Sequence, residues 1–254
     1  DLKGELSACT ARVLRERGET VYIVNLADVW LSLLGKSADF NILNLIADDF
    51  HKYAEGLLDV SDDVFELTMQ LYPEPASAGA SGSDNSYFRG GSRRLIAFYV
   101  ITCILYFGYD ASLADVLERL QDRQLAHREA LLGCGRLEVG DNGGTIPALP
   151  IHDSPWAEKH STEALEAFAA YYRSLAASVA DLDGAKDDRT LMSFLEGARQ
   201  ALARFNPSTR ASRKTSGRST FRFAEQKESK NPVTVFIVGD ASRTEALKDQ
   251  FGLL

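Results

Sequence analysis

Cysteine and histidine are scarce in this sequence of 254 residues, which contains three cysteines and four histidines. The cysteines, Cys9, Cys103 and Cys134, are an odd number at wide spacing, and Cys103 lies in an apolar run that suits a small hydrophobic residue. The histidines are His51, His127, His152 and His160. Because zinc sites use paired Cys or His residues at short spacing, the sequence argues against a metal site and indicates folding in a reducing compartment.

Long apolar runs are absent as well. The longest spans residues 95–107, which is shorter than the roughly 17 to 25 residues needed to cross a bilayer. No part of the sequence predicts a membrane-spanning helix, a signal peptide or a transit segment. The chain begins at Asp1 rather than at an initiator Met, so we expect it to belong to a longer protein, whose membrane anchors would lie outside it.

Basic residues are fewer than acidic ones, 28 against 36, which gives a formal net charge of -8. A chain with this charge repels a phosphate backbone, so any contact with nucleic acid must be local. Apolar residues make up 45% of the sequence. This share is enough for a sizeable buried core and excludes a chain that is disordered throughout.

Strand-forming segments stand near the two ends of the chain. Residues 6–17 favour a helix, Gly18 ends it, and residues 20–24 form a short apolar run rich in β-branched side chains. Residues 233–238 form a second run of the same kind. A helix followed by a buried strand is typical of a parallel α/β sheet, and we predict that both runs belong to one sheet.

Helical periodicity fills the region between these strands. We predict helices over residues 44–58, 61–71, 88–107, 112–132, 158–180 and 188–205. Ser61, followed by Asp62 and Asp63, is typical of a helix N-cap with an acidic first turn. Small polar residues at 76–86 predict a mobile loop, with a plain flexible connector as its ordinary interpretation, and glycines and prolines at 140–155 predict an irregular segment.

The fold class that follows is mainly α, a helical bundle inserted into a partial α/β domain. We divide the chain into an α/β segment at residues 1–43, an all-helical domain at 44–206, and a basic linker that returns to the sheet at 207–254. The first and third parts would together form one sheet-containing unit.

Two short motifs resemble catalytic elements but lack the required spacing. Residues 35–37 (Gly-Lys-Ser) would end a phosphate-binding loop, but that loop needs a glycine at position 30, which is Trp30. Residues 152–154 (His-Asp-Ser) have the composition of a hydrolytic triad, but consecutive residues cannot form its relay. The sequence therefore assigns no catalytic residue.

The segment 208–223 carries five cations and no acidic residue, in an otherwise acidic chain. These cations are Arg210, Arg213, Lys214, Arg218 and Arg222. Phe221 and Phe223 alternate with them and would offer ring faces to unpaired bases, so we predict a possible DNA contact here. The alternative is a solvated loop with a short edge strand.

The opening residues, Asp1-Leu2-Lys3-Gly4-Glu5, combine opposite charges and a glycine just before the first helix. In open α/β sheets, ligands bind at the carboxyl ends of strands, where such a connection lies. Followed by a helix and a strand, this element resembles the Asp-x-Lys-Gly-Glu element of type IV secretion coupling proteins, the TraG/TraD-like conjugative DNA transfer ATPases.

The order of the following segments is also similar to that family. Where the family has an Asn-Pro pair after the strand and then a Tyr-Asn-Pro-Leu-like turn, this chain has Asn25-Leu26 and residues 40–43 (Phe-Asn-Ile-Leu). Tyr87-Phe88-Arg89, ahead of an apolar helix, resembles the start of the family's all-alpha domain. The exit from that domain has counterparts in this chain at residues 190–205, 219–223 and 232–236, which resemble it. Leu26 and Ile42 depart from the pattern and leave the subfamily open.

The resemblance implies a parent protein that is a hexameric ATPase with a RecA-like core, anchored in the bacterial inner membrane. Its all-alpha domain would face the cytoplasm, engage relaxosome or effector proteins, and deliver DNA-protein or effector substrates to the secretion channel. Asp1, Lys3, Gly4 and Glu5 would lie beside the nucleotide. The phosphate loop and the magnesium-binding strand are expected outside the chain, so we expect no bound ATP, no magnesium and no ATP hydrolysis from this part alone.

Two alternatives stay open. A non-enzymatic adaptor, whose acidic helical bundle binds partner proteins, would also suit the net charge. A segregation-type DNA translocase shares the RecA-like core, but no comparable helical insertion is known to us there. Partner binding by residues 44–206 alone would favour the adaptor, and DNA-stimulated ATP hydrolysis in a longer protein would favour a motor.

Overall fold

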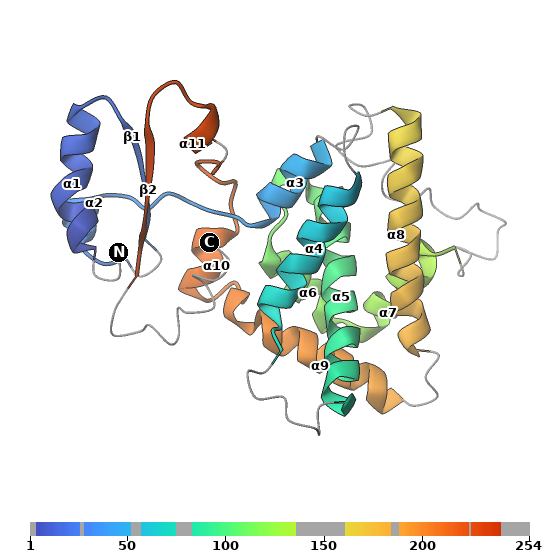
Figure 1. Ribbon diagram of the computed structural model, residues 1–254. Helices are drawn as coiled ribbons and strands as arrows, with labels where there is room; N and C mark the ends of the chain where they lie inside the picture. Colours follow the sequence, from blue (N-terminus) through green and yellow to red (C-terminus); the bar gives the residue numbers. More distant parts are fainter. Residues whose placement is uncertain are drawn as a thin grey trace.

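The computed structural model describes residues 4–25, 28–51, 57–74, 83–135, 161–183, 188–223 and 225–239. Over these residues the protein is mainly helical, with a small two-stranded parallel sheet to one side of a helical bundle (Figure 1). None of the described helices is long and apolar enough to cross a membrane. The predicted irregular segment at 140–155 lies outside the described residues, as does the part of the predicted loop between 76 and 82.

The two ends of the chain meet in the sheet. Strand β1 (Thr20–Asn25) pairs in parallel with β2 (Val233–Val238), and the register places Tyr22 opposite Val235 and Asn25 opposite Val238. The prediction that the two apolar runs belong to one sheet is therefore confirmed. Because the bundle lies between these strands in the chain, it is an insertion between two paired strands.

Each face of the sheet is covered. Helix α1 (Glu5–Glu16) buries Ala11 against Ile23, Leu34 and Val238 on the outer face, and Figure 1 shows this helix on the side away from the bundle. The face toward the bundle packs Val24 against Phe40 and Phe221. Burial on both faces is the usual arrangement for parallel strands, which explains why both runs are almost continuously apolar.

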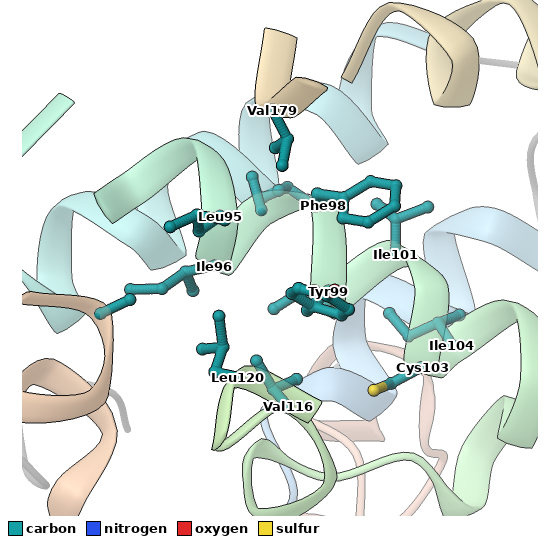
Figure 2. Packing of buried hydrophobic residues seen from close by; sticks show 14 of the residues in the cluster. Leu95, Ile96, Phe98, Tyr99, Ile101, Cys103, Ile104, Val116, Leu120 and Val179 are labelled. Atoms are coloured by element: carbon teal, nitrogen blue, oxygen red, sulfur yellow. The ribbon is translucent and has the colours of Figure 1, made fainter. Parts of the chain in front are cut away.

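Seven helices form the bundle among the described residues. They are α3 (Leu43–His51), α4 (Leu57–Leu71), α5 (Ser83–Phe107), α6 (Leu113–Gln121), α7 (Arg123–Gly133), α8 (Thr162–Asp183) and α9 (Asp188–Leu202). Helix α5 is apolar on nearly every side over residues 95–105, so it lies at the centre of the bundle. Figure 2 shows its Phe98 and Tyr99 with Val116 and Leu120 of α6 and Val179 of α8.

Five shorter elements are described, four of them between the bundle and the sheet and one between α5 and α6. They are α2 (Leu31–Leu34), the 3-10 turns η1 (Gly108–Asp110) and η3 (Ala203–Phe205), α10 (Arg210–Thr215) and α11 (Glu225–Glu228). None of the helices predicted from the sequence extends beyond residue 205. The structure has two short helices after that position, and Thr209 caps the first of them, α10, by accepting from the Ser212 backbone N–H at 3.1 Å.

Helices α5 and α9 cross in close contact. A Cβ added at Gly91 would lie 2.4 Å from the ring of Phe194, and one added at Gly197 would lie 2.4 Å from the Ser92 hydroxyl. The Ser92 hydroxyl donates to the backbone carbonyl of Phe194 at 2.8 Å, a side chain-to-backbone bond between the two helices. Small residues at this crossing let the helix axes approach.

Three predicted helix boundaries are wrong. Ser61 lies inside α4, which begins at Leu57, so it is not an N-cap. Residues 83–86, predicted as loop, are the first turn of α5. The single helix predicted over 112–132 is two helices, because Asp122 has extended backbone between α6 and α7. Arg199 of α9 donates to the carbonyls of Leu120 and Gln121, at 2.9 and 3.1 Å, and so satisfies the freed end of α6.

Candidate functional site

The first part of the candidate site is the start of α1, at the carboxyl ends of the two strands. Gly4 has a left-handed backbone (φ 73°), and a Cβ there would lie 3.1 Å from both the Trp30 ring and the Val238 side chain. The Ser7 hydroxyl donates to the Gly4 carbonyl at 3.0 Å. Because Val238 ends β2, the Gly4-Glu5 pair lies at the carboxyl edge of the sheet. Of the predicted nucleotide-adjacent residues, Asp1 and Lys3 lie outside the described residues.

The loop after β1 forms the next wall of this edge. The buried Asn25 side chain donates to the Val29 carbonyl at 2.7 Å and accepts from the Val29 N–H at 3.1 Å, closing a tight turn. The Asn25 N–H donates to the Ser37 hydroxyl at 2.8 Å. After this turn Trp30 has a positive φ of 50°, and it is 54% exposed beside Gly4. Sequence reasoning missed the turn, although an Asn at the end of an apolar strand was a signal for it.

The second part is the basic segment, and it lies against the same loop. The Lys214 ammonium forms an ion pair with Asp28, with an Nζ to Oδ1 distance of 3.1 Å. The Lys214 carbonyl also accepts from the Phe40 N–H at 3.3 Å. The basic segment therefore contacts the loop after β1 at Asp28, and Gly4 of the opening element lies beside Trp30 of the same loop.

Two further cations of the basic segment form ion pairs with the helical bundle. The Arg218 guanidinium donates to both carboxylate oxygens of Asp110 at 2.7 and 3.1 Å, and lowers the pKa of that carboxyl. Arg222 pairs with Asp48 of α3 at 2.7 Å. The Tyr109 hydroxyl donates to the same Asp48 at 2.8 Å; burial, with this bond, raises the pKa of Tyr109 to about 12.

Of the remaining predicted cations, Arg213 is exposed, and the side chain of Arg210 lies outside the described residues. With three of the five cations already paired, the segment has less free positive charge than its composition indicates. DNA contact through this segment stays a prediction.

The phenylalanines of the segment are part of the core. Phe221 is 1% exposed, and its ring stacks on Tyr22 and Phe40 with centroid distances of 5.1 and 5.7 Å. Phe223 meets the Phe221 ring edge-on at 5.2 Å. The expectation that Phe221 offers a ring face to bases is therefore wrong, because its ring packs against Tyr22 of β1 and against Phe40.

Two asparagines fix the segment between the sheet and the bundle. The buried Asn41 side chain donates to the Ala111 carbonyl at 2.7 Å, and its backbone N–H donates to the Ser219 hydroxyl at 2.9 Å. The Asn44 side chain donates to the Tyr109 carbonyl at 2.7 Å and accepts from the Ser219 N–H at 2.8 Å. The entry to the bundle and the exit from it are thus bonded together, which holds the bundle in a fixed position relative to the sheet edge.

The arrangement is an anchored connection beside a sheet edge of the kind that binds ligands in α/β proteins. Among the described residues it includes a helix N-terminus, an exposed indole ring and cations that are mostly paired with carboxylates. It contains no described group placed as a nucleophile or a general base. Comparison with protein-family models finds no match for the sequence, and comparison with curated proteins finds no relative.

Proposed function

We propose that this chain is part of a coupling protein of the type IV secretion class, an ATP-driven translocase that delivers DNA-protein or effector substrates to a secretion channel. The observation that carries the proposal is the parallel pairing of β1 with β2 around an inserted helical bundle. The sheet would belong to a RecA-like nucleotide-binding domain, and the bundle at 44–206 would be its substrate-receiving domain. The parent would be hexameric and lie at the cytoplasmic face of the bacterial inner membrane.

The placement of the opening element supports this proposal. Gly4 and Glu5 start a helix of 12 residues at the carboxyl edge of the sheet, where nucleotides bind in open α/β folds. The described residues at this edge include no phosphate-binding loop. ATP, when bound, would supply the free energy for translocation, and the contacts to its phosphates and magnesium would come from other parts of the parent. This chain would contribute the edge itself and the coupling to the bundle.

The test is made in the parent protein. Because Asn41 and Ser219 are hydrogen-bonded, residues 42–218 can be replaced by a short Gly/Ser linker without separating β1 from β2. We expect the unmodified parent to hydrolyse ATP faster when DNA is added, and the shortened variant to hydrolyse ATP without delivering cargo. Absence of ATP hydrolysis from the unmodified parent would overturn the proposal.

The DNA contact has a separate test. Neutralising Arg213, Lys214 and Arg218 together is expected to weaken single-stranded DNA binding and reduce its dependence on salt. The matched control removes the partners instead. Because Asp28 and Asp110 neutralise two of these cations, the double variant Asp28→Asn, Asp110→Asn should bind DNA more tightly than the unmodified chain. No binding at low salt by either protein would exclude the contact.

A further inference from the structure

A groove on the helical bundle is not used by the proposed site. Helices α4, α5 and α8 border a volume of about 350 Å³ that is open to solvent, which is within the size range of sites that bind small ligands or single side chains. It is lined by Ser61, Val64, Phe65, Thr68, Gly90, Arg93, Arg94, Ala97, Tyr171 and Leu175. The residues from α4 and α5 recur at spacings of three and four, so each helix presents one continuous face to the groove.

The floor of the groove is open because two small residues of α5 lie there. A Cβ added at Gly90 would have no atom within 4 Å, and Ala97, about two turns further along the same face of α5, contributes only a methyl group. Phe65 on the opposite wall is 62% exposed. An exposed ring and an apolar hollow side by side, with polar residues at the rim, are a feature of protein interaction sites.

The polar part of the groove is positively charged. Arg93 donates to the Tyr72 carbonyl at 2.6 Å and shares the single carboxylate of Glu74 with Arg89. Burial alone would raise the pKa of Glu74, but these two guanidiniums hold its pKa below the ordinary value. Arg94 is exposed and has no ion-pair partner among the described residues. The described lining of the groove contains two guanidiniums, Arg93 and Arg94, and no carboxylate, in a chain of net charge -8.

We infer that this groove binds an amphipathic, acidic helix of a partner protein. An apolar side chain of that helix would fill the hollow over Gly90 beside Phe65, and a carboxylate one turn away would pair with Arg94. This is the arrangement by which helical segments bind grooves between helices, with apolar anchors at spacings of three and four. Charge complementarity selects the acidic partner, although the net charge of the chain as a whole would favour a basic one.

This inference goes beyond the proposed function, because the groove lies on the bundle and needs neither ATP nor DNA. It fits a motor that receives cargo proteins on its helical domain, and equally an adaptor. The experiment therefore uses the chain alone, so that its failure leaves the proposal of a translocation motor untouched.

The probe is a fluorescein-labelled synthetic helical peptide with leucine and phenylalanine on one face and glutamate on the other. Its binding to the chain is measured by fluorescence anisotropy. Two comparison peptides carry lysine in place of glutamate, or the same residues in scrambled order. Gly90→Leu fills the hollow, and Arg94→Glu reverses the charge. Arg173→Glu is the matched control, since Arg173 is exposed on α8 but does not line the groove. Gly90→Leu should fold normally, because its Cβ has space and leucine favours a helix.

We expect the acidic peptide to bind and both comparison peptides to bind at least tenfold more weakly. Arg94→Glu should weaken binding about tenfold, Gly90→Leu should weaken it by at least as much, and Arg173→Glu should change it less than twofold. Equal binding of the acidic and lysine peptides, or binding unaffected by Gly90→Leu, would overturn the inference. So would sedimentation of the unliganded chain as a dimer that Gly90→Leu converts to a monomer, since the occupant would then be a second copy.

Discussion

Gly90 and Gly91 are adjacent in α5, and they give opposite predictions for the same substitution. Helix propensity by itself favours alanine over glycine in a helix interior by up to about 1 kcal/mol at either position. At Gly90 the added methyl group points into open space. We therefore expect Gly90→Ala to raise the free energy of unfolding by about 0.5–1 kcal/mol.

At Gly91 the same methyl group would lie 2.4, 2.6 and 2.7 Å from three ring carbons of Phe194. That ring is fully buried, so it cannot swing into solvent, and α9 must move away from α5. Overpacking of this kind costs about 1–3 kcal/mol, and sometimes more. After subtracting the helix-propensity gain, Gly91→Ala should lower the free energy of unfolding by about 1–2 kcal/mol.

The assay is urea unfolding of the unmodified chain and both variants, followed by far-UV circular dichroism, with thermal unfolding as a second measure. The difference between the two variants should be about 1.5–3 kcal/mol, or roughly 3–12 °C in Tm for a chain of this size. Phe194→Leu should relieve part of the Gly91→Ala cost in the double variant. Two alanine variants within 0.5 kcal/mol of each other would refute the close crossing of α5 and α9.

Three further predictions concern the sheet, α6 and the ion pairs. Phe221→Ala should lower the free energy of unfolding by about 3–5 kcal/mol in urea unfolding, because it empties a buried aromatic site. Ser112→Ala should lower the free energy of unfolding by about 1 kcal/mol in the same assay. Ser112 and Asp115 form a capping box, in which the Ser112 hydroxyl accepts from the Asp115 N–H, and the substitution removes that bond. Arg218→Gln should lower Tm slightly at pH 7. The pKa of Asp110 is lower in the folded chain than the unfolded value of about 3.9, so this pair stabilises above that pH and is lost as pH falls through the folded pKa. A Tm difference that persists at pH 2 would contradict this explanation.

The sheet and the centre of the bundle could be predicted because their signals are local. Residues 20–24 and 233–238 are apolar runs of strand length, and residues 95–105 are too apolar for a surface helix. Each pattern fixes an element and its burial without reference to any distant residue. The pairing of the two strands then followed from the rules for parallel sheets.

The features that were missed depend on partners far away in the sequence. The end of α6 at Gln121 is stabilised by Arg199, 78 residues along the chain, and no residue near 121 indicates a break. Phe221 alternates with cations as an exposed strand would, but Tyr22 and Phe40 bury it. The pairing of Lys214 with Asp28 was hidden in the same way. Local composition gives the formal charge of a segment. It does not show which of those charges are neutralised by ion pairs with residues far away in the sequence.

The sheet joins residues that are very far apart in the chain, and this has a consequence for how the molecule folds. Thr234 donates to Glu19 at 3.1 Å across a separation of 215 residues. In a disordered chain, bringing such distant ends together costs conformational entropy that grows with the logarithm of the loop length, by about 0.6 kcal/mol for each doubling. A pair of strands this small cannot offset that entropy alone.

Once the bundle has folded, Asn41 and Ser219 are held within hydrogen-bonding distance, and the loop that remains to be closed is shorter by roughly sixfold. The entropic cost of joining the strands then falls by about 1.5 kcal/mol, so strand pairing should follow bundle formation during refolding. In the native state the same order predicts that amide hydrogens of β1 and β2 exchange with solvent sooner than those at the centre of α5. The sheet edge would thus be the last part to assemble and the first to open.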